Sequence, residues 1–314
     1  MTTALLIDPV YQRHQTGKGH PERPERIGAL YEALEQAGLL SALPRVPVRT
    51  AVEDELALCH TREYIGIAKR DVASGRHQLT TGDTAISNTS WDVALEAVGG
   101  VLNSVDMVLG GKASNAFCAV RPPGHHATPN RGMGFCLFNN VAIAARYAQR
   151  RHGIERVLIV DWDVHHGNGT QDIFYSDPSV LFFSTHQWPW YPGTGEPDET
   201  GTGAAKGMTI NCPLPAGSGR EEVLGAVEHR LKPAAKAFKP DLVMLSAGFD
   251  SRRGDPLGRF TLGDEDFAEL TRVCMEIAAT YAKGRLVSVL EGGYDLAGLA
   301  AASVAHVGEL RTAG

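Results

Sequence analysis

The sequence predicts an α/β fold, a three-layer sandwich in which helices cover both faces of a mostly parallel sheet. Short apolar segments recur along the chain, and from about residue 116 they alternate with helical patterns. The 314 residues are 43% hydrophobic, which is enough to bury one large core. Because no Pro/Ser-rich linker, low-complexity tract or internal repeat divides them, we expect a single domain over residues 1–314.

Seven apolar segments have the length of buried strands. They lie at residues 4–7, 116–120, 157–160, 180–184, 208–211, 242–246 and 286–290. Several are continuously apolar rather than alternating, which is typical of strands that are covered on both faces. The repeated strand and helix patterns therefore favour a parallel sheet over an antiparallel one.

Apolar side chains at helical spacing predict the covering helices. The longest predicted helices span residues 25–36, 91–109, 221–238 and 264–282. Gly38 follows the first as a C-cap, and Asn88 precedes the second as an N-cap. Ser218, with Glu221 three residues later, predicts a capping box at the third. The Gly/Pro-rich stretch 188–207 is too long for a simple connection, which indicates a functional loop.

Composition and charge exclude several classes of protein. A net charge of -6 and a pI near 6.1 argue against nucleic acid as the main partner, since phosphate contacts need clustered Lys and Arg. Every apolar stretch is too short to span a membrane, and the first residues lack the pattern of a signal peptide. Five cysteines without a Cys-x-x-Cys motif favour free thiols in a reducing compartment. We therefore expect a cytoplasmic location.

Polar motifs follow four of the predicted strands. They are His125-His126, Asp163 with His165, Asp250 and Tyr294, which follow the strands at 116–120, 157–160, 242–246 and 286–290. The carboxyl ends of parallel strands meet at one edge of a sheet, and ligands of open α/β sheets bind at that edge. We therefore expect the four motifs to form one site.

Asp163 and His165 are two residues apart, so in an extended segment their side chains project to the same side. A carboxylate oxygen and an imidazole nitrogen suit Zn²⁺, and also Fe²⁺, Mn²⁺ or Co²⁺. Asp250 is the best placed third ligand, which leaves positions for water and a substrate carbonyl. The alternative is a helix-capping Asp163 with a solvent-facing His165. Tyr294, unless it is an ordinary half-buried tyrosine, is placed to donate a hydrogen bond to an oxyanion.

Two adjacent histidines, His125 and His126, follow a Pro/Gly turn at residues 122–124. Neighbouring side chains on a strand diverge, so both can face one site only from a loop, which this turn supplies. Asp161 and Asn168 flank the metal motif and are candidate partners. A histidine beside a carboxylate holds its proton more readily than one beside an amide, so the two would differ in role. The alternative is a surface pair without function.

These motifs resemble those of the metal-dependent histone deacetylases. The matching segments are residues 20–27, 121–126, 132–136, 161–170, 246–250, 254–257 and 290–294, which span nearly the whole chain. Trp162, Val164 and Asn168 resemble the class II branch and its bacterial relatives, the deacetylase-like amidohydrolases. The resemblance implies the arginase/deacetylase fold, with a parallel sheet of about eight strands.

The resemblance also implies a role for each residue of the site. One Zn²⁺ per subunit would be held by Asp163, His165 and Asp250. His126 would be the general base, and His125, paired with Asp161, an electrostatic or acid group. Tyr294 would bind the oxyanion. Since Asn168 stands where the class I branch has a carboxylate, His126 is expected to be less basic than in that branch. The family also binds K⁺ beneath this site, which here implies Asp161, Asp163, His165 and Ser184.

A narrow channel for the acyl-lysine stem is a further implication. The residues implied for it are Gly134, Phe135, Tyr191, Leu257 and Asp83. Tyr191 stands in place of a second channel phenylalanine, which makes that wall less apolar. Leu257 occupies a gate position that is acidic in eukaryotic polyamine deacetylases, so an ammonium group finds no carboxylate there. Asp83 is expected to hold the substrate backbone, with Ser87 as a rival.

The function expected from this resemblance is zinc-dependent hydrolysis of the acyl amide, chiefly acetyl, of N-acyl-lysine in proteins or peptides. One alternative is deacylation of acetylpolyamines or other small N-acyl amines. Another is an inactive module that binds acyl-lysine. A two-metal hydrolase of the arginase type is disfavoured because the extra carboxylates it needs are absent around Asp163 and Asp250. The expected partner is the substrate alone, without nucleic acid or membrane.

Overall fold

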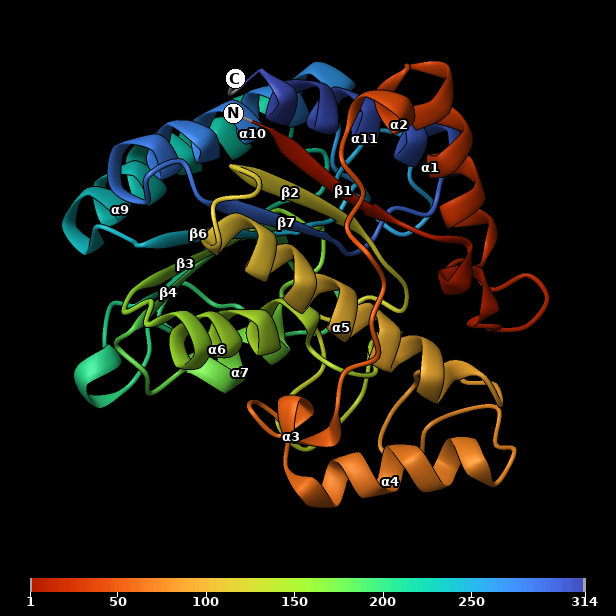
Figure 1. The fold of residues 1–314 in the computed structure, drawn as a ribbon. Helices are drawn as coiled ribbons and strands as arrows, with labels where there is room; N and C mark the ends of the chain where they lie inside the picture. Colours follow the sequence, from red (N-terminus) through yellow and green to blue (C-terminus); the bar gives the residue numbers. More distant parts are fainter. Residues whose placement is uncertain (1, 313–314) are drawn as a thin grey trace.

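A single parallel sheet forms the centre of the molecule (Figure 1). The computed structural model describes residues 2–312. Its strands are β1 (Thr3–Ile7), β2 (Asn115–Ala119), β3 (Val157–Asp161), β4 (Val180–Gln187), β5 (Thr209–Leu214), β6 (Leu242–Ala247) and β7 (Leu286–Leu290). These seven strands pair in the order β1-β2-β7-β6-β3-β4-β5, and every pair is parallel. The predicted α/β class is confirmed, whereas the expectation of about eight strands is corrected to seven.

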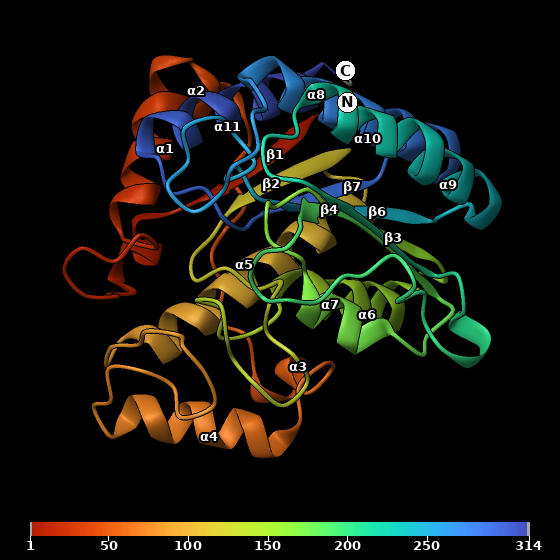
Figure 2. The ribbon, with the colours of Figure 1, turned by 180° about the vertical axis from the view of Figure 1, so that it is seen from behind.

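Helices cover both faces of this sheet. One layer holds α1 (Glu25–Gln36), α2 (Leu39–Ala42), α8 (Arg220–Ala226), α9 (Lys232–Phe238), α10 (Asp264–Tyr281) and α11 (Leu296–Arg311) (Figures 1 and 2). The other holds α5 (Ser90–Leu109), α6 (Asn140–His152) and α7 (Asn168–Phe174), with α3 (Glu53–Leu56) and α4 (Arg62–Ala73) outside them. Short 3-10 helices lie at Pro9–Arg13 and Gly203–Ala205, and a π-helical stretch, Val227–Leu231, joins α8 directly to α9. No helix within residues 2–312 is both long and apolar enough to cross a membrane.

The burial of the strands explains their composition. Six strands are buried along their whole length, and β5, at one edge, is partly exposed. In a strand that is covered on both faces, burial of every apolar side chain stabilises the fold. The sequence of such a strand therefore does not alternate between apolar and polar residues. β4 continues three residues beyond the predicted end, Ser184, because its polar end pairs with β5.

Two of the predicted helix caps are wrong by one residue. The N-cap of α5 is Thr89 rather than Asn88. At α8 the Glu222 carboxylate accepts the Gly219 N–H at 2.8 Å, so the predicted box of Ser218 and Glu221 does not form. The Ser218 carbonyl accepts the N–H of Thr261 instead, which holds Ser218 in the preceding loop. Gly38 does follow α1 with the left-handed φ of 69° that a C-terminal glycine permits.

The order of the strands places the site. From β3 the chain proceeds to β4 on one side, and from β6 it proceeds to β7 on the other side. The carboxyl ends of β3 and β6 therefore flank the point where the winding of the sheet reverses, which is where open α/β sheets bind ligands. The four motif-bearing strands β2, β7, β6 and β3 are also consecutive in the sheet.

Candidate active site

Asp163, His165 and Asp250 converge beyond the ends of β3 and β6. His165 Nδ1 lies 3.0 Å from Asp163 Oδ1 and 3.1 Å from Asp250 Oδ2. One ligand atom from each residue lies within 4.8 Å of the others, and all three residues are buried. Since α7 begins at Asn168 and His165 is only 8% exposed, the alternative of a helix-capping Asp163 with a solvent-facing His165 is wrong.

This cluster fits a metal cation. Burial and the charge of Asp163 together raise the pKa of Asp250 to about 7, because a second negative charge is disfavoured in this buried cluster. Within residues 2–312 neither carboxylate is bonded to a Lys or Arg side chain. Two carboxylate oxygens and an imidazole nitrogen form a donor set that suits Zn²⁺. A divalent cation there would compensate the buried negative charge.

Backbone groups hold both carboxylates in place. Asp163 Oδ2 accepts the N–H of Gly292 at 2.8 Å, and Asp250 Oδ1 accepts the N–H of Val164 at 2.9 Å. A Cβ atom at Gly292 would lie 2.0 Å from Asp250 Oδ2 and 2.6 Å from Asp163 Oδ2. The loop after β7 therefore needs glycine at this position, because any side chain would occupy the space of the carboxylates.

We expect Gly292→Ala to lower metal affinity by about 10–100-fold, the range observed when the partners of metal ligands are disturbed. The added methyl group would displace both carboxylates from the positions in which they can bind the metal. Competition with a fluorescent chelator measures the affinity, and circular dichroism checks the fold. Gly308→Ala is the matched control, since a Cβ there has no neighbour within 4 Å. Affinity within twofold of wild type for Gly292→Ala would contradict this interpretation of the turn.

The two adjacent histidines have different partners. His125 Nδ1 lies 2.9 Å from Asp161 Oδ2, and His126 Nδ1 lies 2.7 Å from Asn168 Oδ1. Burial alone would lower the pKa of His125, but the Asp161 and Asp163 carboxylates raise that pKa well above its ordinary value. For His126, burial and the neighbouring His125 and His165 lower the pKa well below its ordinary value. His125 is therefore held as the cation and His126 as the neutral imidazole.

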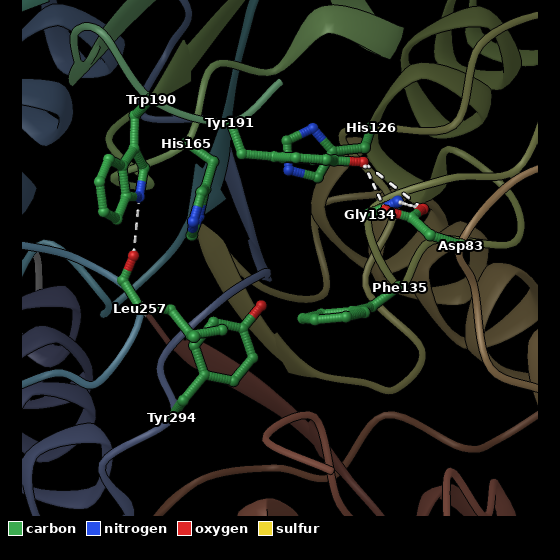
Figure 3. Close-up of a pocket in the computed structure, with 9 residues that line it drawn as sticks. All are labelled: Asp83, His126, Gly134, Phe135, His165, Trp190, Tyr191, Leu257 and Tyr294. Atoms are coloured by element: carbon green, nitrogen blue, oxygen red, sulfur yellow. Dashed lines mark hydrogen bonds between the residues drawn. The ribbon is translucent and has the colours of Figure 1, made fainter. Parts of the chain in front are cut away.

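Tyr294 lies opposite the metal-ligand cluster on the glycine loop after β7. Its hydroxyl points into the same cavity as the His165 imidazole (Figure 3). Burial and the nearby Asp250 charge raise the pKa of the Tyr294 phenol well above its ordinary value, so the phenol keeps its proton. Asp255 Oδ2 accepts the Tyr294 N–H at 2.7 Å and fixes this part of the loop. The phenol is thus a buried hydrogen-bond donor.

A cavity of about 250 Å³ reaches His126, His165 and Tyr294 and opens to the surface beside the exposed residues Asp83 and Tyr191. Its lining consists of Asp83, His126, Gly134, Phe135, His165, Trp190, Tyr191, Leu257 and Tyr294 (Figure 3). All five residues expected for the channel are among them. The rival Ser87 is not, because its hydroxyl is bonded to Thr89 and Ser90 in the turn before α5. Asp161 and Ser184, expected to bind K⁺, are register partners on β3 and β4.

Two residues of the site were missed at the level of sequence. Glu291 Oε2 accepts the N–H groups of Gly124 and His125 at 2.7 and 3.1 Å, so it holds the histidine loop. Burial raises the pKa of Glu291 to about 7. Trp190 lines the cavity and its indole donates to the Leu257 carbonyl at 2.8 Å. The position of Glu291 directly after an apolar strand could have identified it as a site residue. For Trp190 the sequence offered only its place in a long loop.

Comparisons with known proteins show what the chain is similar to. The family model described as the histone deacetylase domain matches residues 20–310. A probable deacetylase of Archaeoglobus fulgidus is 40% identical over 301 residues, which cover 95% of this chain and 83% of that protein. Polyamine deacetylase HDAC10 of Homo sapiens is 42% identical over 291 residues, 89% of this chain and 43% of that protein. The crystal structure of the HDA15 HD domain has a TM-score of 0.94 and 36% identity, covering 99% of this chain and 89% of that one.

Proposed function

The chain belongs to the histone deacetylase family, and from this premise we propose that it is a zinc-dependent amidohydrolase that removes an acyl group, chiefly acetyl, from lysine side chains of proteins or peptides. The observation that carries the proposal is one cavity lined by a neutral imidazole, a protonated phenol and His165, which belongs to a buried cluster of three candidate metal ligands. Hydrolysis of an amide by water requires a polarised carbonyl, removal of a proton from the water and stabilisation of the oxyanion, and these groups together can supply all three.

One Zn²⁺ per subunit would be held by Asp163, His165 and Asp250. When bound, such an ion polarises the amide carbonyl and lowers the pKa of a coordinated water. The family resemblance also implies K⁺ as a structural ion at Asp161, Asp163, His165 and Ser184; Asp161 and Ser184 are register partners on neighbouring strands.

His126 is the group that we assign as general base. The oxygen of the Asn168 amide can only accept a hydrogen bond, so His126 Nδ1 carries the ring proton. The lone pair is then on Nε2, the atom left to take a proton from the attacking water. His125 bonds Asp161 and lies 3.8 Å from Asp163 Oδ2, which suits a cation that stabilises negative charge. Either His125 or His126 would protonate the leaving amine.

The remaining cavity residues bind and orient the substrate. Tyr294 would donate its hydroxyl to the oxyanion that develops from the substrate carbonyl. Phe135, Tyr191 and Leu257 would enclose the apolar stem of the acyl-lysine, and Gly134 and Asp83 lie beside them. Excluding water from the stem strengthens the electrostatic interactions at the carbonyl.

The direct test is an assay of acetyl-lysine peptide hydrolysis that quantifies both products. We expect acetate and the deacetylated peptide, with its free lysine side chain, to appear in equal amounts, without a co-substrate that accepts the acetyl group. Tight binding of the acetyl peptide without turnover would instead favour the alternative of an acyl-lysine binding module. The catalytic assignment would then be abandoned.

A second candidate function is deacylation of acetylpolyamines or other small N-acyl amines. It is favoured by the similarity to a protein named as a polyamine deacetylase and by the carboxylate of Asp83 in the cavity. The neutral Leu257 at the gate position argues against it. Comparing kcat/KM for an acetyl-lysine peptide with that for an acetylpolyamine decides between the two substrates.

We also retain the cytoplasmic location as a prediction. The five cysteines are free and buried in the structure, as the sequence led us to expect for a reducing compartment.

A further inference from the structure

We propose that Tyr191 is a specificity-determining residue that acts through Asp83. The family resemblance already implies that Asp83 holds the substrate backbone; what we add is that the Tyr191 hydroxyl orients the Asp83 carboxylate at the rim of the cavity for the peptide N–H groups. The proposal rests on the proposed function and deepens it, because it favours peptides over small N-acyl amines as the substrate class.

Three loops that are distant in sequence meet at Asp83. Tyr191, in the long connection between β4 and β5, places its hydroxyl 3.2 Å from Asp83 Oδ2 (Figure 3). The N–H of Gly134 donates to Asp83 Oδ1 at 2.7 Å. The carboxylate itself is exposed, on the loop before α5. An exposed aspartate would otherwise rotate freely, so these two donors define the direction of its remaining lone pairs.

Tyr191 combines two separable contributions. Its ring stands edge-on to the imidazoles of His126 and His165, with centroids 5.2 and 6.2 Å away, and forms part of the channel wall. Its hydroxyl contributes only the bond to Asp83. Tyr191→Phe therefore removes the bond to the carboxylate and preserves the wall.

The chemistry of the rim distinguishes two kinds of substrate. Among the residues that line the cavity, Asp83 alone carries a carboxylate, and the facing wall of Trp190 and Leu257 has no ionised group. A peptide N–H needs an oriented lone pair, since hydrogen bonds weaken steeply when misaligned. The ammonium of a polyamine interacts with charge, which is not directional. Orientation by Tyr191 therefore benefits the peptide more than the polyamine.

The test is a double-mutant cycle in which the measured quantity is the ratio of kcat/KM for a peptide substrate to kcat/KM for a polyamine substrate. kcat/KM is measured for an acetyl-lysine peptide and for N-acetylspermidine with wild type, Tyr191→Phe, Asp83→Ala and the double variant. We expect Tyr191→Phe to lower the peptide-to-polyamine ratio by about three- to tenfold, the range for one hydrogen bond, mainly through KM for the peptide. In the Asp83→Ala background the same change should alter the ratio less than twofold.

Two additional variants serve as controls for this test. Asp83→Asn keeps an oxygen for the Gly134 N–H, so it separates loss of the substrate acceptor from loosening of that loop. Tyr31→Phe removes a hydroxyl from an exposed tyrosine on α1 outside the cavity, and should leave the ratio unchanged. An unchanged ratio in Tyr191→Phe, or an equal loss with and without Asp83, would overturn the proposal.

A binding measurement separates this inference from the proposed function. If wild type hydrolyses neither substrate, the proposed function fails. The role of Tyr191 is then read from the affinity for a peptide whose acetamide is replaced by the isosteric methyl ketone, which cannot be hydrolysed. We expect Tyr191→Phe to weaken this binding about three- to tenfold. Equal affinity for the variant and wild type would overturn the assignment of Tyr191.

Discussion

Replacing Tyr294 by phenylalanine is expected to lower kcat for an acetyl-lysine peptide by about 100- to 1,000-fold, the usual effect of removing one oxyanion donor. The phenol is buried, keeps its proton and points into the cavity beside the metal-ligand cluster. A negative oxygen exists in the transition state but not in the bound amide. KM should therefore change much less than kcat.

Steady-state kinetics on the purified variant measure this effect, and thermal unfolding confirms that the fold is retained. Tyr31→Phe, the same chemical change at an exposed position on α1, should keep wild-type kcat. A Tyr294→Phe enzyme with more than a third of wild-type kcat would show that another group binds the oxyanion. A loss confined to KM would instead assign Tyr294 to substrate binding.

Replacing Asp250 by asparagine is expected to lower zinc affinity by more than about 100-fold and to abolish most turnover with it. Loss of an outer partner of a ligand already costs about 10–100-fold in affinity, so loss of a direct ligand costs more. Asp250 supplies one of three ligand atoms and half of the carboxylate charge in the cluster. Chelation of the wild-type enzyme should have the same effect on activity, reversed by added Zn²⁺.

In the metal-free protein, Asp250→Asn should not lower the thermal stability, although the same substitution weakens zinc binding. Burial and the charge of Asp163 raise the pKa of Asp250, so without a cation the Asp250 carboxylate lowers the free energy of unfolding. Metal-free Asp250→Asn is expected to unfold at a Tm no lower than metal-free wild type. Added Zn²⁺ should raise the Tm of wild type only, since a ligand stabilises the state that binds it.

Elemental analysis after dialysis measures how much zinc each protein retains. Thermal unfolding with and without Zn²⁺ measures the Tm. The control is Asp71→Asn, which removes a buried carboxylate on α4, far along the chain from the cluster. Its zinc content should equal that of wild type. Stoichiometric zinc at wild-type affinity in Asp250→Asn would remove Asp250 from the ligand set.

The fold was predictable because strands that are covered on both faces have a recognisable, continuously apolar sequence. Residues 157–160 and 242–245, for example, are continuously apolar, since both faces of these strands are buried. Helix starts were less predictable. Asn88 and Thr89 are both capping residue types, and which one adjoins the first turn depends on where the chain leaves the preceding loop. The strand count was wrong because it came from the family resemblance rather than from this chain.

The site was predictable to the extent that strand ends share an edge. His126 and Asn168 are 42 positions apart, yet both follow predicted strands, so their proximity was expected. The bond between Tyr191 and Asp83 spans 108 positions and joins two loops, and no periodicity relates them. The same holds for Trp190 and Leu257, whose contact depends on how the long loop folds back over the sheet.

The sequence by itself determined the class of fold, the strands and the chemical groups at their carboxyl ends, because burial and residue type are local properties. The tertiary structure alone decided that β3 and β6 are neighbours, and hence that Asp163, His165 and Asp250 converge. It also decided how the rim loops meet at Asp83. Strand order and loop packing follow from the summed burial of the whole chain, which no single segment encodes.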